Sequence, residues 1–201
     1  MTRNVPETKA RKRVRSIALA SAPLVCSSLF LVSCHHDSAS TQSTARASLQ
    51  LDSHSFVAGA RFPGRFTCDG ADSSPELHWP SPPAGTKSFA IVMSDPDAPA
   101  DFTHWIAFNL PAGARQLAEG ASTHGAMPAG SAEGTNSFGR IGYGGPCPPL
   151  GKLHHYVFRI YALDVSLDFG PGASRDQIES AMSGHILAEG QIIGIYGRPG
   201  S

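Results

Sequence analysis

The stretch YGGPCPPLGKLHHYVF, residues 143–158, decides how the rest of the chain is interpreted. Its first half is rich in glycine and proline, which fix a backbone path that other residues resist. Its second half is rich in aromatic and β-branched residues, a pattern that predicts a strand from Leu153 to Leu163. The stretch therefore predicts a rigid turn leading into a strand that starts with His154 and His155.

The rest of the chain shows many short strand patterns separated by turn residues. Ser174, Gln177 and Gly184 mark the start and end of a single short helix over 174–182. Residues 112–142 are rich in Gly, Ala and Ser and predict a long loop. These features indicate a mostly β fold, a two-sheet antiparallel β-sandwich with one short helix near the C-terminus. Further strands are expected around 49–57, 77–79, 87–93, 103–110 and 186–196.

The first 33 residues have the composition of a secretory signal. Six basic residues face one acid, Glu7, and an apolar run from Ile17 to Val32 follows. The run ends in Leu-Val-Ser-Cys at Cys34, which resembles the lipobox of bacterial lipoproteins. That resemblance implies cleavage before Cys34 and lipidation of its thiol. An ordinary signal peptide with an incidental cysteine is the alternative.

Residues 34–48 are small and polar, so we expect a flexible tether before a domain over 49–201. His35 and His36 offer imidazoles to a metal, but an adjacent exposed pair is more often part of a tether. Since His35, rather than an acid, follows Cys34, family analogy favours the outer membrane. We therefore expect a cell-envelope lipoprotein that faces the periplasm.

Removing the leader changes the charge of the chain. The whole sequence has 16 basic and 16 acidic residues, and the leader takes six and one of them. The remaining 168 residues carry 10 and 15, a formal charge of −5. A nucleic-acid partner calls for a basic surface, so this composition argues against one.

Two cysteines remain after the leader and Cys34 are set aside. Cys68 and Cys147 form one pair in an oxidising compartment, and a disulfide between them is predicted. Two buried free thiols are the alternative, because the sequence alone does not give the distance between them.

Chemistry-bearing side chains follow the apolar strand 87–93. Asp95 and Asp97 lie in the turn Ser-Asp-Pro-Asp-Ala-Pro, and His104 opens the next strand. Paired carboxylates can transfer protons or bind a cation, although Asp and Pro also simply make good turns. If the two strands lie side by side, Asp95, Asp97 and His104 share one end of the sheet. In the strand from Leu153, His154 and Tyr156 share a face and His155 takes the other.

Six short motifs occur in the chain: FTCDG at 66–70, DPDAP at 95–99, THW at 103–105, YGGPCPP at 143–149, HHYVF at 154–158 and GHILA at 184–188. Together they resemble the phosphatidylethanolamine-binding protein family, and its bacterial YbhB/YbcL, or Raf-kinase-inhibitor-like, branch in particular. The resemblance extends from about Leu49 to Tyr196 and implies a two-sheet β-sandwich with a small anion-binding pocket at one end.

The resemblance also implies which residues bind the ligand: Asp95, Asp97, His104, Gly145, Pro146, His154 and Tyr156. Imidazole and phenol groups, with the backbone N–H of Gly145, can donate hydrogen bonds to a phosphate or carboxylate. The two acids can orient the imidazoles or accept the proton of a singly protonated phosphate.

The leading hypothesis is therefore a protein that binds a small phosphorylated or carboxylate-bearing ligand, with Cys34 as its link to a membrane. No catalytic residue, cofactor or metal ligand is predicted, because the chain lacks the motifs of serine hydrolases, zinc proteases and P-loops. Two alternatives stay open. One is a hydrolase with a His/Asp pocket, and the other is an interaction protein that inhibits an unidentified partner.

Overall fold

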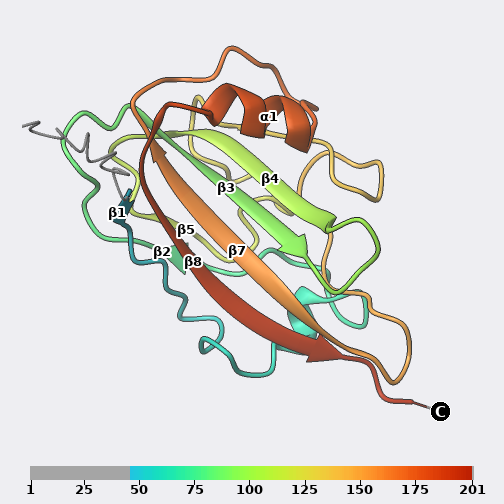
Figure 1. Cartoon of the computed structure of the whole chain (residues 1–201). Coiled ribbons are helices and arrows are strands. Elements are labelled where there is room, and N and C mark those ends of the chain that lie inside the picture. Colours follow the sequence, from blue (N-terminus) through green and yellow to red (C-terminus); the bar gives the residue numbers. More distant parts are fainter. Residues whose placement is uncertain (1–45, 201) are drawn as a thin grey trace, which may run out of the picture. The chain divides into compact units, whose positions relative to one another are not determined.

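The computed structural model describes residues 46–200 as eight strands in two sheets with one short α-helix, which confirms the mostly β prediction (Figure 1). The larger sheet has the order β1-β8-β7-β3-β4-β6, and β2 pairs with β5. The strands are β1 (Ala47–Ser48), β2 (Leu77–His78), β3 (Ser88–Asp95), β4 (Phe102–Pro111), β5 (Gln116–Leu117), β6 (Ala132–Glu133), β7 (Leu153–Leu163) and β8 (Ile186–Gly197); η1 is Gly64–Phe66 and α1 is Arg175–Met182.

Four long antiparallel strands, β8, β7, β3 and β4, form the centre of the larger sheet. All eight residues of β3 are buried, as its continuous apolar pattern predicts for a strand covered on both faces. Phe89 and Met93 pack into one cluster, while Ala90 belongs to a second cluster on the other face. The sheet therefore separates two apolar layers.

The helix covers one of these faces. The Ser174 side chain accepts the backbone N–H of Gln177, and the Gln177 side chain accepts the backbone N–H of Ser174, so the predicted cap is confirmed as a reciprocal capping box. Ile178 and Met182 of α1 pack with Phe108 in the smaller apolar cluster. This packing fixes the helix on the sheet.

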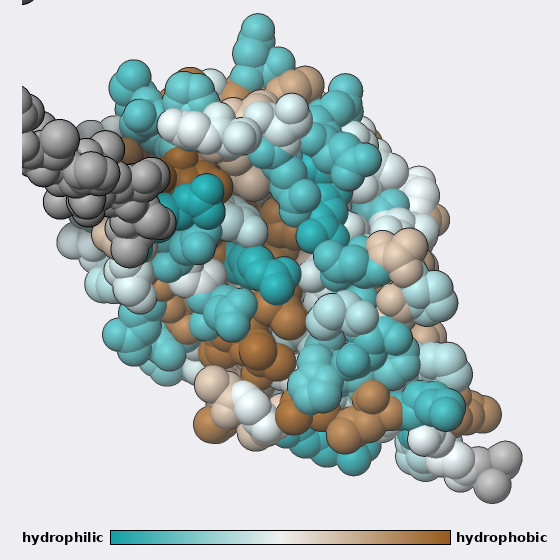
Figure 2. Space-filling model, in the orientation of Figure 1, coloured by the Kyte–Doolittle hydropathy of each residue, from teal (hydrophilic) through white to brown (hydrophobic). Residues whose placement is uncertain are grey.

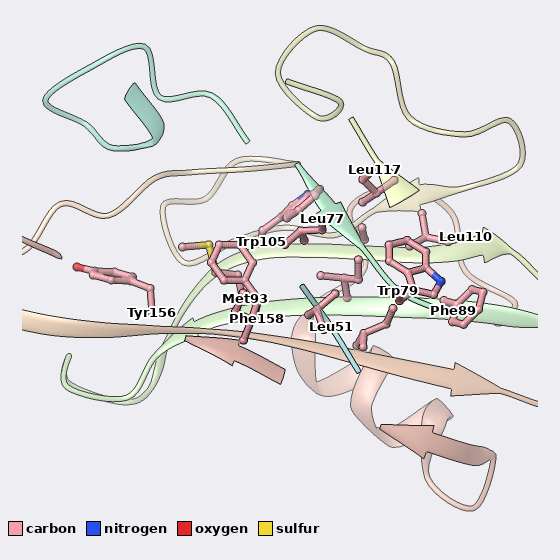
Figure 3. Packing of buried hydrophobic residues seen from close by; sticks show 14 of the residues in the cluster. Leu51, Leu77, Trp79, Phe89, Met93, Trp105, Leu110, Leu117, Tyr156 and Phe158 are labelled. Atoms are coloured by element: carbon pink, nitrogen blue, oxygen red, sulfur yellow. The ribbon is translucent and has the colours of Figure 1, made fainter. Parts of the chain in front are cut away.

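The opposite face of the larger sheet is covered by residues 49–66 and by the β2-β5 pair. Figure 3 shows Leu77 and Trp79 lying over the long strands, and the Trp79 ring meets Phe89 edge-on with centroids 5.3 Å apart. Fully buried aromatic side chains, including Trp105 and Phe158, make up much of this layer. Burial of so much apolar surface is the main source of stability of the domain.

The first strand differs from the expected pattern. Ordered strand begins at Ala47, two residues before the expected start at Leu49, and β1 runs parallel to β8 in an otherwise antiparallel sheet. A Cβ at Gly190 of β8 would collide with the backbone oxygen of Leu49, so only glycine permits this close approach. The expected loop over 112–142 also contains β5 and β6.

Cys68 and Cys147 are joined by a disulfide with their Cα atoms 5.4 Å apart, which confirms the predicted pair. The predicted leader, Cys34 and most of the tether lie outside the residues that the structure describes. Across 46–200, no helix has the length and hydropathy needed to cross a bilayer. In the view of Figure 2, hydrophilic side chains cover most of the surface, with hydrophobic ones between them near the middle.

Candidate functional site

Asp95 ends β3 and organises the turn that follows it. One carboxylate oxygen, Oδ1, accepts the backbone N–H groups of Asp97 at 3.0 Å and of Ala98 at 3.1 Å. An aspartate that accepts the N–H two residues on stabilises such a turn, as its sequence suggests. The second oxygen, Oδ2, remains for another partner, and the residue is buried.

His154 is that partner. Strand β7 pairs with β3, and Nδ1 of His154 lies 2.7 Å from Asp95 Oδ2, with the two side chains only 12% and 5% exposed. A carboxylate accepts, so Nδ1 carries the proton and Nε2 is the ring nitrogen left for a ligand. A protonated His154 would donate from Nε2, and a neutral one would accept there.

His104 is held in a different way. Its Nδ1 donates to the backbone oxygen of Gly144 at 2.6 Å, and the Gly144 N–H donates to the backbone oxygen of His104 at 2.9 Å. Burial lowers the pKa of His104 below its usual value, although the backbone of Gly144 and Gly145 and the charge of Asp95 act in the opposite sense. The imidazole is therefore favoured in its neutral form, with Nε2 as a hydrogen-bond acceptor.

Tyr156 supplies the third polar group. Its ring meets the His104 ring edge-on at 5.2 Å, and its buried hydroxyl has no hydrogen-bond partner within residues 46–200. Burial raises the pKa of the Tyr156 hydroxyl strongly, and the Asp95 carboxylate adds to the effect. The hydroxyl thus stays protonated. The nearby Asp95 carboxylate favours that state, but its oxygens accept from Asp97, Ala98 and His154, and neither oxygen meets the geometry of a hydrogen bond with the hydroxyl. Buried donors of this kind are uncommon in folded proteins.

These groups line one cavity of about 200 Å³. The loop that carries Phe138 is fixed by Asn136, whose side chain accepts the backbone N–H groups of Phe138 and Arg140 and donates to Gly142. The walls are mostly carbon, so polar contacts there are concentrated in a few groups. The lining residues are Asp95, Ala98, Pro99, Phe102, His104, Phe138, Cys147, Pro148, Pro149, His154 and Tyr156.

Four of the predicted site residues therefore meet in the cavity: Asp95, His104, His154 and Tyr156. Asp97 does not line it. The Asp97 carboxylate accepts both the backbone N–H and Nδ1–H of His155, each at 2.7 Å, on the exposed side of β7. The hydrogen bond from the His155 side chain is the main cause that lowers the pKa of Asp97.

Gly145 and Pro146 also lie outside the lining. The Gly145 N–H, predicted as a donor to the ligand, donates instead to Asp72 Oδ1 at 2.6 Å. A Cβ at Gly145 would collide with the backbone oxygen of Phe66, so glycine is needed here for close packing. Pro146 accepts the backbone N–H of Cys68. Through these contacts the two residues hold the backbone that leads into Cys147, Pro148 and Pro149 of the lining.

Sequence reasoning missed the hydrophobic part of the cavity. Phe102 and Phe138 pack edge-on at 4.8 Å and both contact His104, but they lie in segments that no motif marks. The prolines Pro148 and Pro149 stood in the quoted stretch and could have been recognised as wall residues from their rigidity.

The cavity thus joins one buried hydroxyl and two oriented imidazoles at one end of the larger sheet. The family of the chain follows from comparison. Residues 52–197 match the family model described as phosphatidylethanolamine-binding protein, and the chain belongs to this family.

Similar proteins of known sequence or structure support this family assignment. A UPF0098 protein of Methanothermobacter thermautotrophicus is 46% identical over 151 residues, which are 75% of this chain and 99% of the relative. The crystal structure of Escherichia coli YbcL, described as a member of the mammalian PEBP family, matches with a TM-score of 0.71 and 33% identity over 75% of this chain and 99% of YbcL. The PEBP homolog CT736 of Chlamydia trachomatis matches with a TM-score of 0.68 and 36% identity over 75% of this chain and 98% of CT736.

Proposed function

We propose that the protein binds a small anion, a phosphate or carboxylate group carried by a ligand, in the cavity around His104, His154 and Tyr156. The observation that carries the proposal is the Tyr156 hydroxyl, a buried donor with no acceptor in hydrogen-bond geometry among residues 46–200, although the Asp95 carboxylate lies nearby. An anionic oxygen in the cavity would supply that acceptor and would recover the cost of burying the hydroxyl.

The two imidazoles narrow the class of ligand. His104 is favoured as a neutral ring with Nε2 as an acceptor, so a bound anion should carry a proton that it can donate. His154, paired with Asp95, can donate from Nε2 when it is protonated. A singly protonated phosphate or phosphomonoester offers both an O–H and anionic oxygens, and thus fits the three groups.

Calorimetry with the full chain tests this proposal. We expect saturable binding of inorganic phosphate and phosphoethanolamine. Sulfate has no proton near neutral pH and leaves the His104 acceptor unsatisfied, so its affinity should be lower than that of phosphate by at least about 10-fold. The substitutions His104→Asn and His154→Asn keep an N–H near the position of Nδ1 and remove Nε2, so each should abolish measurable binding.

An exposed histidine provides the control. His185 also pairs with a carboxylate, Asp164, at 2.8 Å, but it does not line the cavity, and His185→Ala should leave phosphate affinity unchanged. Unchanged affinity in both cavity variants would refute the proposal.

A hydrolase is the second candidate, favoured by one observation. The Asp95–His154 pair has the arrangement in which a carboxylate orients a general base. The described cavity lining contains no serine or threonine beside this pair, and Cys147 is bonded to Cys68. Turnover of a chromogenic phosphoester that disappears in Asp95→Asn would support the hydrolase over the binding protein.

We also propose that the chain is a YbhB/YbcL-like lipoprotein of the bacterial cell envelope, anchored in the outer membrane through Cys34. The basic leader and the lipobox-like sequence support this location. Mass spectrometry of the membrane fraction should find lipidated Cys34, and Cys34→Ser should release the protein from the membrane.

The same cavity variants locate the binding surface of any protein partner that this chain modulates. A partner that binds outside the cavity should still co-purify with the His104→Asn and His154→Asn variants, and one that binds in the cavity should not.

A further inference from the structure

We propose that His54, Glu76 and His78 form a binding site for a divalent transition-metal ion such as Zn²⁺. Each side chain offers one ligand atom, and these three atoms all lie within 4.8 Å of one another. The Nδ1 atoms of His78 and His54 lie 2.9 Å and 3.4 Å from the same carboxylate oxygen, Oε1 of Glu76. Both imidazoles and the carboxylate therefore converge on one point.

The backbone holds the two contributing segments together. Asp52 and His78 exchange two backbone hydrogen bonds of 2.9 Å, which pair the first segment with β2. The Ser53 hydroxyl donates to the backbone oxygen of Glu76 at 2.5 Å, and the Glu76 N–H donates to Ser55 Oγ at 3.1 Å. The ligand atoms are thus brought together by a paired backbone rather than by chance contacts of side chains.

Glu76 is oriented for this role. Its Oε2 accepts the backbone N–H of His54 at 2.6 Å, and its side chain is only 16% exposed. This bond fixes the carboxylate so that Oε1 turns toward both imidazoles. A hydrogen bond to the second oxygen of a ligating carboxylate is a common support of metal sites. Glu76 directly precedes β2, and its Oε1 lies 2.9 Å from Nδ1 of His78 within that strand.

The donor set selects the class of ion. Two imidazoles and one carboxylate match zinc sites that have three protein ligands and an open fourth position. Imidazole nitrogen suits Zn²⁺, Ni²⁺ and Cu²⁺, whereas Ca²⁺ and Mg²⁺ prefer sites made of oxygen atoms. A metal binds an imidazole only in its neutral form, with the proton on the ring nitrogen that faces away from the ion, so protonation of the imidazoles at low pH should weaken binding.

The site can also close around an ion at little cost. The two imidazole rings stack with centroids 4.2 Å apart and an angle of 19° between their planes. Ligand atoms that hold a tetrahedral ion at about 2.0–2.2 Å lie roughly 3.4 Å from one another. The 3.4 Å between His54 Nδ1 and Glu76 Oε1 already fits, and the 2.9 Å between His78 Nδ1 and Glu76 Oε1 has to open slightly. The His54 side chain is 81% exposed, so it can turn toward the ion without disturbing the core.

This site is separate from the cavity, because none of its three residues lines it. Sequence analysis predicted no metal ligand here, since 22 positions separate His54 from Glu76 and only the fold joins them. The inference does not depend on the proposed anion binding, and each can fail alone.

The test is calorimetric titration of the full chain with ZnCl₂. His35 and His36 are replaced by alanine in every sample, so that the adjacent pair in the N-terminal segment cannot contribute. We expect one Zn²⁺ per chain, with no comparable binding of Mg²⁺. His54→Ala, His78→Ala and Glu76→Gln should each lower Zn²⁺ affinity at least about 10-fold, since even supporting residues of metal sites have effects of this size.

His185→Ala is the matched control. His185 has an exposed side chain and pairs with Asp164 at 2.8 Å, but no third ligand among residues 46–200 joins the pair, so its loss should leave Zn²⁺ affinity unchanged. The proposal is overturned if His54→Ala, the most exposed of the three positions, binds Zn²⁺ as tightly as the parent. Phosphate titration of His54→Ala should match the parent, which separates this result from a failure of the cavity.

Discussion

Two adjacent residues of β7 make the same bond in different surroundings. His154 pairs with Asp95 and His155 pairs with Asp97, and in both pairs Nδ1 and Oδ2 are 2.7 Å apart. The side chains of the first pair are 12% and 5% exposed, whereas those of the second are 50% and 41% exposed. Equal distances therefore do not imply equal roles, because water competes with the second pair and hardly reaches the first.

Alternation along the strand produces this difference. Successive side chains of a strand point to opposite faces, so His154 turns to the cavity and His155 turns to solvent. The inner pair, His154–Asp95, orients an imidazole in the cavity, and the outer pair, His155–Asp97, stabilises the turn after β3. Four changes would break or sharpen this comparison.

Removal of the disulfide should have the largest effect. Cys147 lines the cavity on the side of the inner pair, and 79 positions separate it from Cys68. The double substitution Cys68→Ser with Cys147→Ser should lower the free energy of unfolding by about 4 kcal/mol, measured by urea denaturation. The imidazole NMR signals of His154 should change and those of His155 should not. A loss below about 1 kcal/mol would contradict the role of the disulfide.

The two aspartates should differ next. Asp95→Ala removes an acceptor of three hydrogen bonds and leaves a buried imidazole unpaired, so we expect a loss of about 3 kcal/mol. Asp97→Ala breaks an exposed pair and should cost at most about 1 kcal/mol. Chemical denaturation of both variants makes the comparison, and equal losses would show that burial does not separate the pairs.

Tyr156→Phe should separate stability from binding. The substitution removes a buried hydroxyl that no partner in 46–200 satisfies, so the unliganded protein should become more stable by about 1 kcal/mol. Phosphate affinity should fall about 10-fold, because the donor is lost. Thermal unfolding with and without phosphate measures both effects. A less stable variant would indicate that the hydroxyl has a partner in the unliganded protein.

The smallest effect concerns pH and His104. Burial lowers the pKa of His104 from its usual 6.5, so just below that pH the unfolded chain binds more protons than the folded one. The contribution of His104 to stability is complete above about pH 6.5 and decreases as the pH falls through the window down to the folded pKa. His104→Asn keeps a donor for Gly144 and does not titrate. The parent should therefore lose stability relative to this variant as the pH falls below about 6.5, and a constant difference would contradict the assignment.

Much of the fold could be predicted because local patterns specify it. The strand from Leu153, the doubly buried β3 and the capping box of α1 each follow from the sequence nearby. The four predicted residues that line the cavity could also be found from the sequence, because they lie near the ends of strands that pair side by side.

The remaining features depend on contacts between distant segments. The family resemblance implied that the Gly145 N–H binds the ligand. Nothing near Gly145 in the sequence shows that Asp72, 73 positions away, accepts this N–H instead. Asp97 was assigned to the cavity because its spacing from Asp95 does not show that His155 holds it on the outside. Phe138 reaches the cavity through a loop whose path depends on Asn136.

The parallel pairing of β1 with β8 also determines where the chain enters the domain. Ala47 lies opposite Ala188, while His154 at the cavity lies opposite Tyr196, eight residues further along β8. At the usual rise of a strand, this interval is roughly 26 Å. Strand β8 therefore separates the cavity from the start of the domain, and a ligand bound there would lie about two thirds of the strand's length from the point where any upstream segment joins.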